Sequence, residues 1–152
     1  MIASPLTRRA VVAGGLLSTA ALSGCSVSEL TKRKTEDPEA ADRARLAKAR
    51  DLSLQLHGEI QATMTQDPQL SPTLTKIRDV HLEQIAQFTS SAGLANPRAA
   101  ASTSAPLTLR TLPDRERALA QTFRALALHA QRGDVAALLA SAAAGVDQVM
   151  AR

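Results

Sequence analysis

Aromatic and sulfur-containing side chains are scarce in this chain of 152 residues, which has two phenylalanines, one cysteine, and neither tryptophan nor tyrosine. Carbohydrate-binding platforms and base-stacking surfaces usually depend on aromatic rings, so neither kind of surface is expected. A single cysteine forms no internal disulfide and no thiolate metal cluster. The sequence also lacks a serine nucleophile motif, a glycine-rich phosphate loop and an HExxH zinc signature. Enzymatic activity is therefore unsupported.

A dense basic face and a long apolar run are missing as well. The chain has 18 Lys and Arg against 14 Asp and Glu, a mild excess. A nucleic-acid-binding protein would be expected to carry a strongly basic surface, so nucleic acid is not an expected partner. The apolar stretch Ala10–Leu22 has about 13 residues, whereas a transmembrane helix needs roughly 20. This stretch is therefore not expected to span a membrane.

Residues 1–24 have the three parts of a secretory signal peptide. Arg8 and Arg9 supply positive charge, Ala10–Leu22 supplies the apolar stretch, and Ser23-Gly24 supplies small residues. The segment around the arginine pair also resembles a twin-arginine export signal. The general secretion route and the twin-arginine route both stay open, and the second would export the protein already folded.

Leu22-Ser23-Gly24-Cys25 resembles the lipobox of bacterial lipoproteins. In that family the cysteine thiol receives diacylglycerol and the signal peptide is removed just before it. The resemblance implies that Cys25 becomes the lipidated N-terminus and anchors the protein on the extracytoplasmic face of the cell membrane. Removing 24 of 152 residues leaves 128, close to the size of one ordinary domain.

Residues 25–37 are expected to form a polar tether. They include the basic cluster Lys32-Arg33-Lys34. This cluster is either a solvated part of the tether or a site attracted to anionic lipid headgroups. Such attraction contributes about 1 kcal/mol of binding free energy per basic residue near the membrane surface. In both cases the tether keeps the folded domain, residues 38–152, near the bilayer.

Two start signals predict the first pair of helices. Asp37-Pro38 predicts an N-cap and first helical position, and the helix continues to about residue 65. Ser71-Pro72 repeats the signal and predicts a second helix to about residue 90. The short connection makes these helices antiparallel. Their apolar stripes recur every third or fourth residue; the members are Leu52, Leu56, Ile60 and Met64 in the first, and Leu74, Ile77, His81, Ile85 and Phe88 in the second.

A second helical hairpin is predicted from about residue 113 onward. Thr111 is expected to cap the third helix, and Gly133-Asp134 to end it and cap the fourth. Residues 91–110 can extend for roughly 65 Å, enough to return along a whole bundle. The alternative, a flexible linker, would leave each hairpin with an exposed apolar face. We predict an all-α four-helix bundle; the stripes of the second hairpin are Leu119, Phe123, Leu126 and Ala130, then Val135, Leu138, Leu139, Ala142, Val146 and Val149.

The lipobox, the hairpin–crossover–hairpin order, and the segments from Leu74 to Gln84 and from Ala136 to Ala142 resemble the ferritin-like domain of actinobacterial lipoproteins. The resemblance covers about residues 39–152 and implies a ferritin-like bundle, in which one long crossover joins two antiparallel hairpins.

A ferritin-like di-iron site takes one glutamate from each of two helices and a Glu-x-x-His pair from each of the other two. Glu59 and Glu116 could occupy the single-glutamate positions and His81 a histidine position. Arg78, however, replaces the glutamate three residues before His81, and the fourth helix has no glutamate or histidine, Asp147 being its nearest substitute. A complete di-metal centre is not expected, and no cofactor is predicted.

Two functions therefore stay open. The first is a membrane-anchored, non-enzymatic helical module that contacts an envelope protein or a small apolar ligand, or serves as a scaffold. The second is a degenerate ferritin-like metal-binding protein using Glu59, His81 and Glu116. His81 is either a buried histidine bonded to a neighbour or a ligand or proton-responsive group, with Glu59 as its expected partner. His57 and His129 are expected to be solvated.

Overall fold

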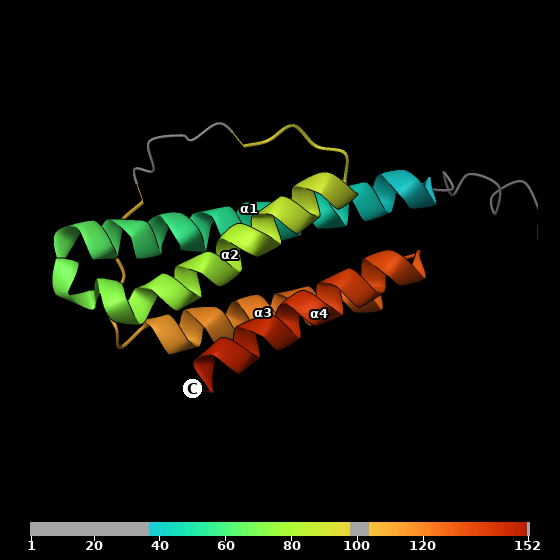
Figure 1. Ribbon diagram of the computed structural model, residues 1–152. Helices are drawn as coiled ribbons and strands as arrows, with labels where there is room; N and C mark the ends of the chain where they lie inside the picture. Colours follow the sequence, from blue (N-terminus) through green and yellow to red (C-terminus); the bar gives the residue numbers. More distant parts are fainter. Residues whose placement is uncertain (1–36, 98–103, 152) are drawn as a thin grey trace, which may run out of the picture. The chain divides into compact units, whose positions relative to one another are not determined.

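The computed structural model describes residues 37–97 and 104–151, and this part of the chain is helical without strands (Figure 1). Its elements are α1 (Pro38–Gln66), the short 3₁₀ helix η2 (Pro68–Leu70), α2 (Ser71–Ser91), α3 (Leu112–Leu128) and α4 (Gly133–Met150). The four predicted helices are confirmed, with boundaries within about two residues except at the end of α3, which stops at Leu128, before the predicted stop at Gly133, so that Ala130 of its predicted stripe lies outside the helix. The predicted signal peptide, the lipobox with Cys25 and the tether up to residue 36 lie outside the described residues.

The four helices form two antiparallel hairpins, α1 with α2 and α3 with α4 (Figure 1). Helices contact each other most extensively within a hairpin. α2 ends beside the start of α1, which we call the Asp37 end. α3 begins at the other end of α1, the Asp67 end, where the backbone N–H of Leu107 donates to Thr63 Oγ1 at 2.7 Å. The end of α2 and the start of α3 therefore lie at opposite ends of the bundle, as a long crossover requires; residues 98–103 of the connection lie outside the described residues.

Asp37 and Thr111 occupy their predicted N-cap positions, but only Asp37 makes a side-chain capping hydrogen bond. Asp37 Oδ1 accepts from the backbone N–H of Glu39 at 3.0 Å, as a cap should. Ser71 is the first residue of α2 instead of its cap, because the 3₁₀ turn before it already has helical geometry. Thr111 also has helical dihedral angles, and its hydroxyl bonds to Thr108. Asp134 lies in the first turn of α4 and does not cap it.

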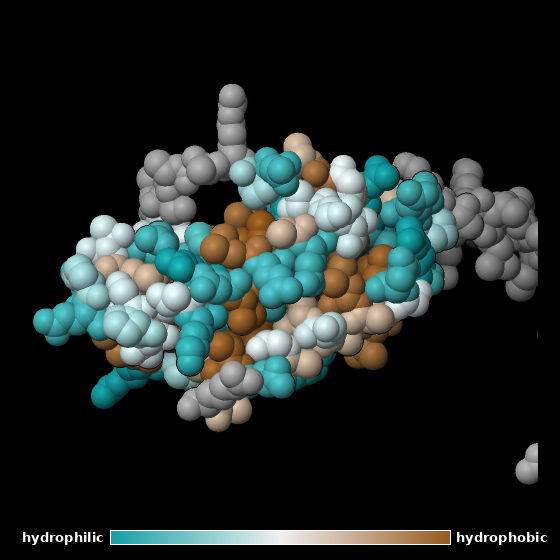
Figure 2. Space-filling model, in the orientation of Figure 1, coloured by the Kyte–Doolittle hydropathy of each residue, from teal (hydrophilic) through white to brown (hydrophobic). Residues whose placement is uncertain are grey.

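The core joins both hairpins through apolar side chains. The rings of Phe88 and Phe123 meet edge to face, with centroids 5.5 Å apart, and both are fully buried. All five predicted stripe residues of α2 are buried, whereas Leu52, Leu126 and Leu138 are only half-buried. On the face seen in Figure 2, hydrophobic residues show between α2 and α4 and are surrounded by hydrophilic ones.

Candidate functional site

A buried polar layer crosses the interior of the bundle, and every helix contributes to it. His81 Nε2 on α2 lies 2.9 Å from Glu116 Oε1 on α3, and His81 Nδ1 lies 3.3 Å from Gln84 Oε1. Gln84 Nε2 donates to the carbonyl oxygen of Ala142 on α4 at 3.0 Å. Ser53 Oγ on α1 donates to Gln84 Oε1 at 3.4 Å. We call these five residues the polar layer.

The polar layer lies on the apolar stripes themselves. His81 stands between Ile77 and Ile85 on the buried face of α2, and Glu116 stands four residues after Leu112 and three before Leu119. The side chains of His81 and Glu116 are 0% exposed. Burying such groups is costly unless they are hydrogen-bonded, which explains why they meet. Glu116 Oε2 nevertheless has no hydrogen-bond partner among the described residues.

The expected partnership of His81 with Glu59 is wrong. Glu59 lies one position beside the buried Ile60, on the flank of α1 that faces the start of α3. There Arg115 Nη2 donates to both carboxylate oxygens of Glu59, at 2.7 and 2.8 Å. The structure therefore brings together His81 and Glu116 but not Glu59. Within residues 37–97 and 104–151, no three His, Cys, Asp or Glu side chains are placed to share a metal ion.

The other two histidines differ in their surroundings. His129 is exposed after the end of α3, as expected. His57 is half-buried on α1, which the sequence did not predict. Burial lowers the pKa of His57, since it disfavours the charged imidazolium, and the charges of His81 and Arg78 lower it further. His57 is therefore held toward its neutral form.

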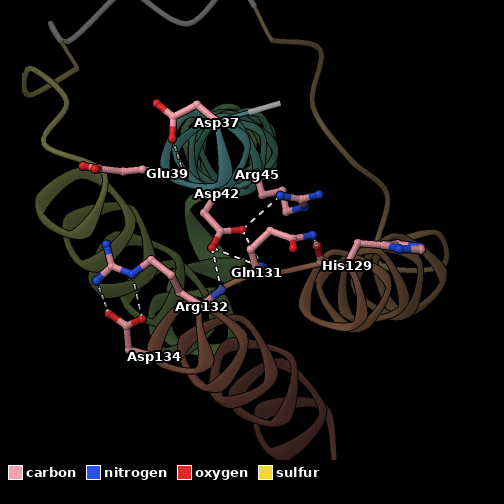
Figure 3. Close-up of polar contacts among 8 residues, drawn as sticks. All are labelled: Asp37, Glu39, Asp42, Arg45, His129, Gln131, Arg132 and Asp134. Carbon is pink, nitrogen blue, oxygen red and sulfur yellow. Dashed lines mark hydrogen bonds and ion pairs between the residues drawn. The ribbon is translucent and has the colours of Figure 1, made fainter. Parts of the chain in front are cut away.

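Asp42, on the second turn of α1, joins the two hairpins at the Asp37 end. Its carboxylate points toward the turn between α3 and α4 (Figure 3) and is almost completely buried. It accepts the backbone N–H groups of Gln131 at 2.9 Å and Arg132 at 2.8 Å, and Arg45 Nη1 at 3.0 Å. Burial would raise the pKa of Asp42, but the two backbone hydrogen bonds and the Arg45 charge together lower the pKa below its usual value.

Sequence reasoning missed Asp42. The start of α4 was expected to be served by Asp134, but Arg132 binds that carboxylate at the surface instead. The acceptor for the Arg132 N–H comes from a residue 90 positions earlier. A signal was present: Asp42 stands at helical spacing before the buried Leu46 and Ala49. A charged residue on a buried stripe predicts a fixed partner, although it does not say which one.

A groove opens beside Asp42 at the Asp37 end, with about 280 Å³ of space. Its apolar lining comes from α1, α4 and the residue that follows α2, and its charged rim comes from α1 and the start of α4. The volume is close to that of the smallest ligand pockets, about 300 Å³. Leu46, Ala92 and Val135 give the apolar lining, and Glu39, Arg43 and Arg132 the rim.

Within the described residues, no helix is both long and apolar enough to cross a membrane. Comparisons with protein-family models, with curated proteins and with solved structures gave no match. The ferritin-like resemblance therefore rests on the sequence pattern. The structure adds only the helical architecture.

Proposed function

We propose that this protein is a lipoprotein anchored through Cys25 on the extracytoplasmic face of the cell membrane, and that its helical bundle is a non-enzymatic interaction module. The carrying observation is the sequence Leu22-Ser23-Gly24-Cys25 after an arginine pair and a short apolar stretch. From Cys25 to Asp37 is 37 − 25 = 12 positions, which extend for at most about 40 Å. A partner of the bundle is thus an envelope protein that works close to the bilayer.

The groove at the Asp37 end is the surface we assign to this partner. Its lining is mostly polar around the nearly buried Leu46, Ala92 and Val135, and the rim offers charges of both signs, which suits a polar or charged segment of a partner. The tether joins the bundle at Asp37, which lies at the same end of the bundle as the groove. A protein bound in the groove would therefore lie near the anchor, which favours a membrane-associated partner over a diffusing one.

Replacing Cys25 with alanine tests the anchor. The Cys25→Ala protein is expected to leave the membrane fraction, because the thiol that carries the lipid is gone. Membrane fractionation followed by mass measurement of the N-terminal peptide gives the result. A variant that stays in the membrane fraction and an unmodified Cys25 in the parent protein would each contradict the proposal.

Photo-crosslinking tests the groove. A photoreactive residue at Ser91, on the groove, is expected to give a crosslinked species in intact cells, and Arg43→Glu is expected to weaken it by reversing the charge on the rim. The same photoreactive residue at Gln69, exposed at the Asp67 end, is the matched control. Equal crosslinking from both positions would exclude the groove as the contact surface.

The second candidate function is a degenerate ferritin-like metal-binding protein. One observation favours it: Glu116 Oε2 lies buried and unpartnered beside an imidazole, inside a bundle with one long crossover. We propose a ferritin-like relationship on the order of the helices, which such bundles share. His81 and Glu116 would then be ligands, and Glu59 would have to leave Arg115 to join them.

Metal analysis separates the two functions. For an interaction module, protein purified from its native host is expected to contain no stoichiometric metal. Stoichiometric iron or manganese that is lost on His81→Ala would overturn this and support the second function. His129→Ala, which changes an exposed histidine, is the control for nonspecific binding.

A further inference from the structure

The amide of Gln84 has one orientation that the polar layer allows. Its nitrogen must face the carbonyl oxygen of Ala142, 3.0 Å away, since a carbonyl only accepts. The amide oxygen of Gln84 therefore faces Ser53 Oγ and His81 Nδ1. A backbone group of α4 thus fixes which atom of Gln84 the histidine meets.

This orientation determines where the protons of His81 lie. Because Gln84 Oε1 only accepts, His81 Nδ1 must carry a hydrogen. His81 Nε2 and Glu116 Oε1 are 2.9 Å apart, so one proton lies between them. Either an imidazolium donates to a carboxylate or a carboxylic acid donates to a neutral imidazole. In both cases the pair has no net charge.

No other described charge enters this part of the interior. Among the described residues, the buried Asp42 on α1 binds Arg45 and the α3–α4 turn at the Asp37 end, most other charged groups of the surrounding helices are exposed or form surface pairs, and His57 on α1 is half-buried. The surface pairs are Arg78 with Asp79 on α2, Arg115 with Glu59 between α3 and α1, and Arg124 with Asp147 and Arg132 with Asp134 at α4. The His81–Glu116 pair therefore has to balance its own charge.

We infer that this proton-sharing pair, held by Gln84, determines the register in which the two hairpins dock. The apolar stripes repeat every third or fourth residue, so apolar packing alone discriminates weakly against a shift by one turn. Such a shift would separate His81 Nε2 from Glu116 and Gln84 Nε2 from the carbonyl oxygen of Ala142, although Ser53, His81 and Gln84 would stay together on their own hairpin. Leaving these buried polar and ionisable groups without partners is strongly unfavourable, so the polar layer selects one register.

Distance measurement in the full-length protein tests the register. Nitroxide labels at Gln61 on α1 and Gln121 on α3, both exposed, are introduced through an encoded ketone amino acid so that Cys25 is untouched. The parent protein is expected to give one narrow distance. The double variant His81→Leu/Glu116→Leu is expected to broaden it or add a second distance shifted by about 5 Å, one helical turn.

The matched control is His57→Leu/Glu83→Leu, which makes the same changes outside the polar layer, at a half-buried residue of α1 and at an exposed residue of α2 that bonds within its own helix. It is expected to keep the single narrow distance. A double variant at His81 and Glu116 with the parent's distance would overturn the inference. So would a control that broadens as much.

A second measurement covers the case in which the double variant does not fold. In Glu116→Gln, the glutamine amide can donate to His81 Nε2 while His81 Nδ1 still donates to Gln84, so the single distance is expected to persist. Nitrogen-15 spectra of histidine-labelled parent protein are expected to show a protonated Nδ1 at His81. An unprotonated Nδ1, or a broadened distance in Glu116→Gln, would overturn the inference.

Discussion

Asp42 is a single polar residue that connects the two hairpins of a bundle rich in alanine and leucine. It is the acceptor for two backbone N–H groups of the α3–α4 turn, and it lies on a different hairpin. Removing one partner of buried hydrogen bonds costs about 1–3 kcal/mol. Asp42→Ala is therefore expected to lower the free energy of unfolding by that amount, measured by urea denaturation. Asp51→Ala, an exposed aspartate on the same helix, is the control and should change stability by less than about 0.5 kcal/mol.

The lowered pKa of Asp42 adds a pH dependence to the same contact. A carboxyl whose pKa is lower in the folded than in the unfolded chain stabilises the fold above its unfolded pKa, about 3.9, and loses that contribution as pH falls through its folded pKa. The stability difference between the parent and Asp42→Ala is expected to be constant from about pH 5 to 7. It should shrink below about pH 4. A difference that grows on acidification would contradict this sign.

His81 is the second residue whose replacement is expected to lower the stability of the whole bundle. His81→Ala leaves Glu116 buried without its hydrogen-bond partner. Breaking a buried pair by removing one member typically costs about 3–5 kcal/mol. We expect this decrease in unfolding free energy, again by urea denaturation. The exposed His129→Ala should be neutral, and equal effects of the two substitutions would mean that the polar layer contributes nothing specific.

At the scale of helices, the sequence predicted the presence and approximate length of the four helices well, but it predicted the capping hydrogen bonds at their ends poorly. Asp37-Pro38 marked a true helix start because both the side-chain acceptor and the proline lie next to each other in sequence. Ser71 lies inside α2, and Thr111 takes the N-cap position of α3 without a side-chain capping bond, because both residues have helical backbone geometry, which depends on the preceding turn. When the acceptor comes from another helix, as Asp42 does, the sequence beside the capped helix does not identify it.

The Phe88–Phe123 contact joins α2 and α3 inside the core. Phe88→Ala and Phe123→Ala are each expected to cost about 3–5 kcal/mol, since both rings are fully buried. The double variant should cost less than the sum by about 0.5–1.5 kcal/mol, because the edge-to-face pair is lost only once. Thermal and urea unfolding measure this. Leu128→Ala, at a position 84% exposed, is the control, and a comparable loss there would contradict the assigned core.

At the scale of the whole molecule, the described residues, 37–97 and 104–151, belong to one compact unit. A protease site inserted between Lys34 and Thr35 is therefore expected to release a fragment that unfolds at the same temperature as the intact protein. Circular dichroism of the purified fragment gives the midpoint. The intact protein with the same insertion, uncut, is the control. A fragment with a clearly lower midpoint would mean that the first 34 residues contribute to the stability of the bundle.

The candidate sites could be predicted only in part, for a reason that concerns the whole molecule. His81 and Glu116 were recognisable as chemically relevant residues, because each is a titratable group within an apolar stripe. That they face each other, and that Glu59 faces Arg115, depends on how the hairpins are rotated against one another. Helical spacing does not determine this rotation. Residues far apart in sequence determine this rotation together; His81 and Glu116, for example, are 35 positions apart.

The position of Asp42 also has a mechanical consequence. A pull on the chain at Asp37 enters α1 at its first turn, and Asp42 lies on the next turn. Tension can unwind α1 further only after it breaks the hydrogen bonds that the backbone N–H groups of Gln131 and Arg132 donate to Asp42. Because these bonds join the two hairpins, both hairpins carry the force. A bundle held at one end by its chain resists peeling best when its first attachment to the opposite hairpin is this close to the point of loading.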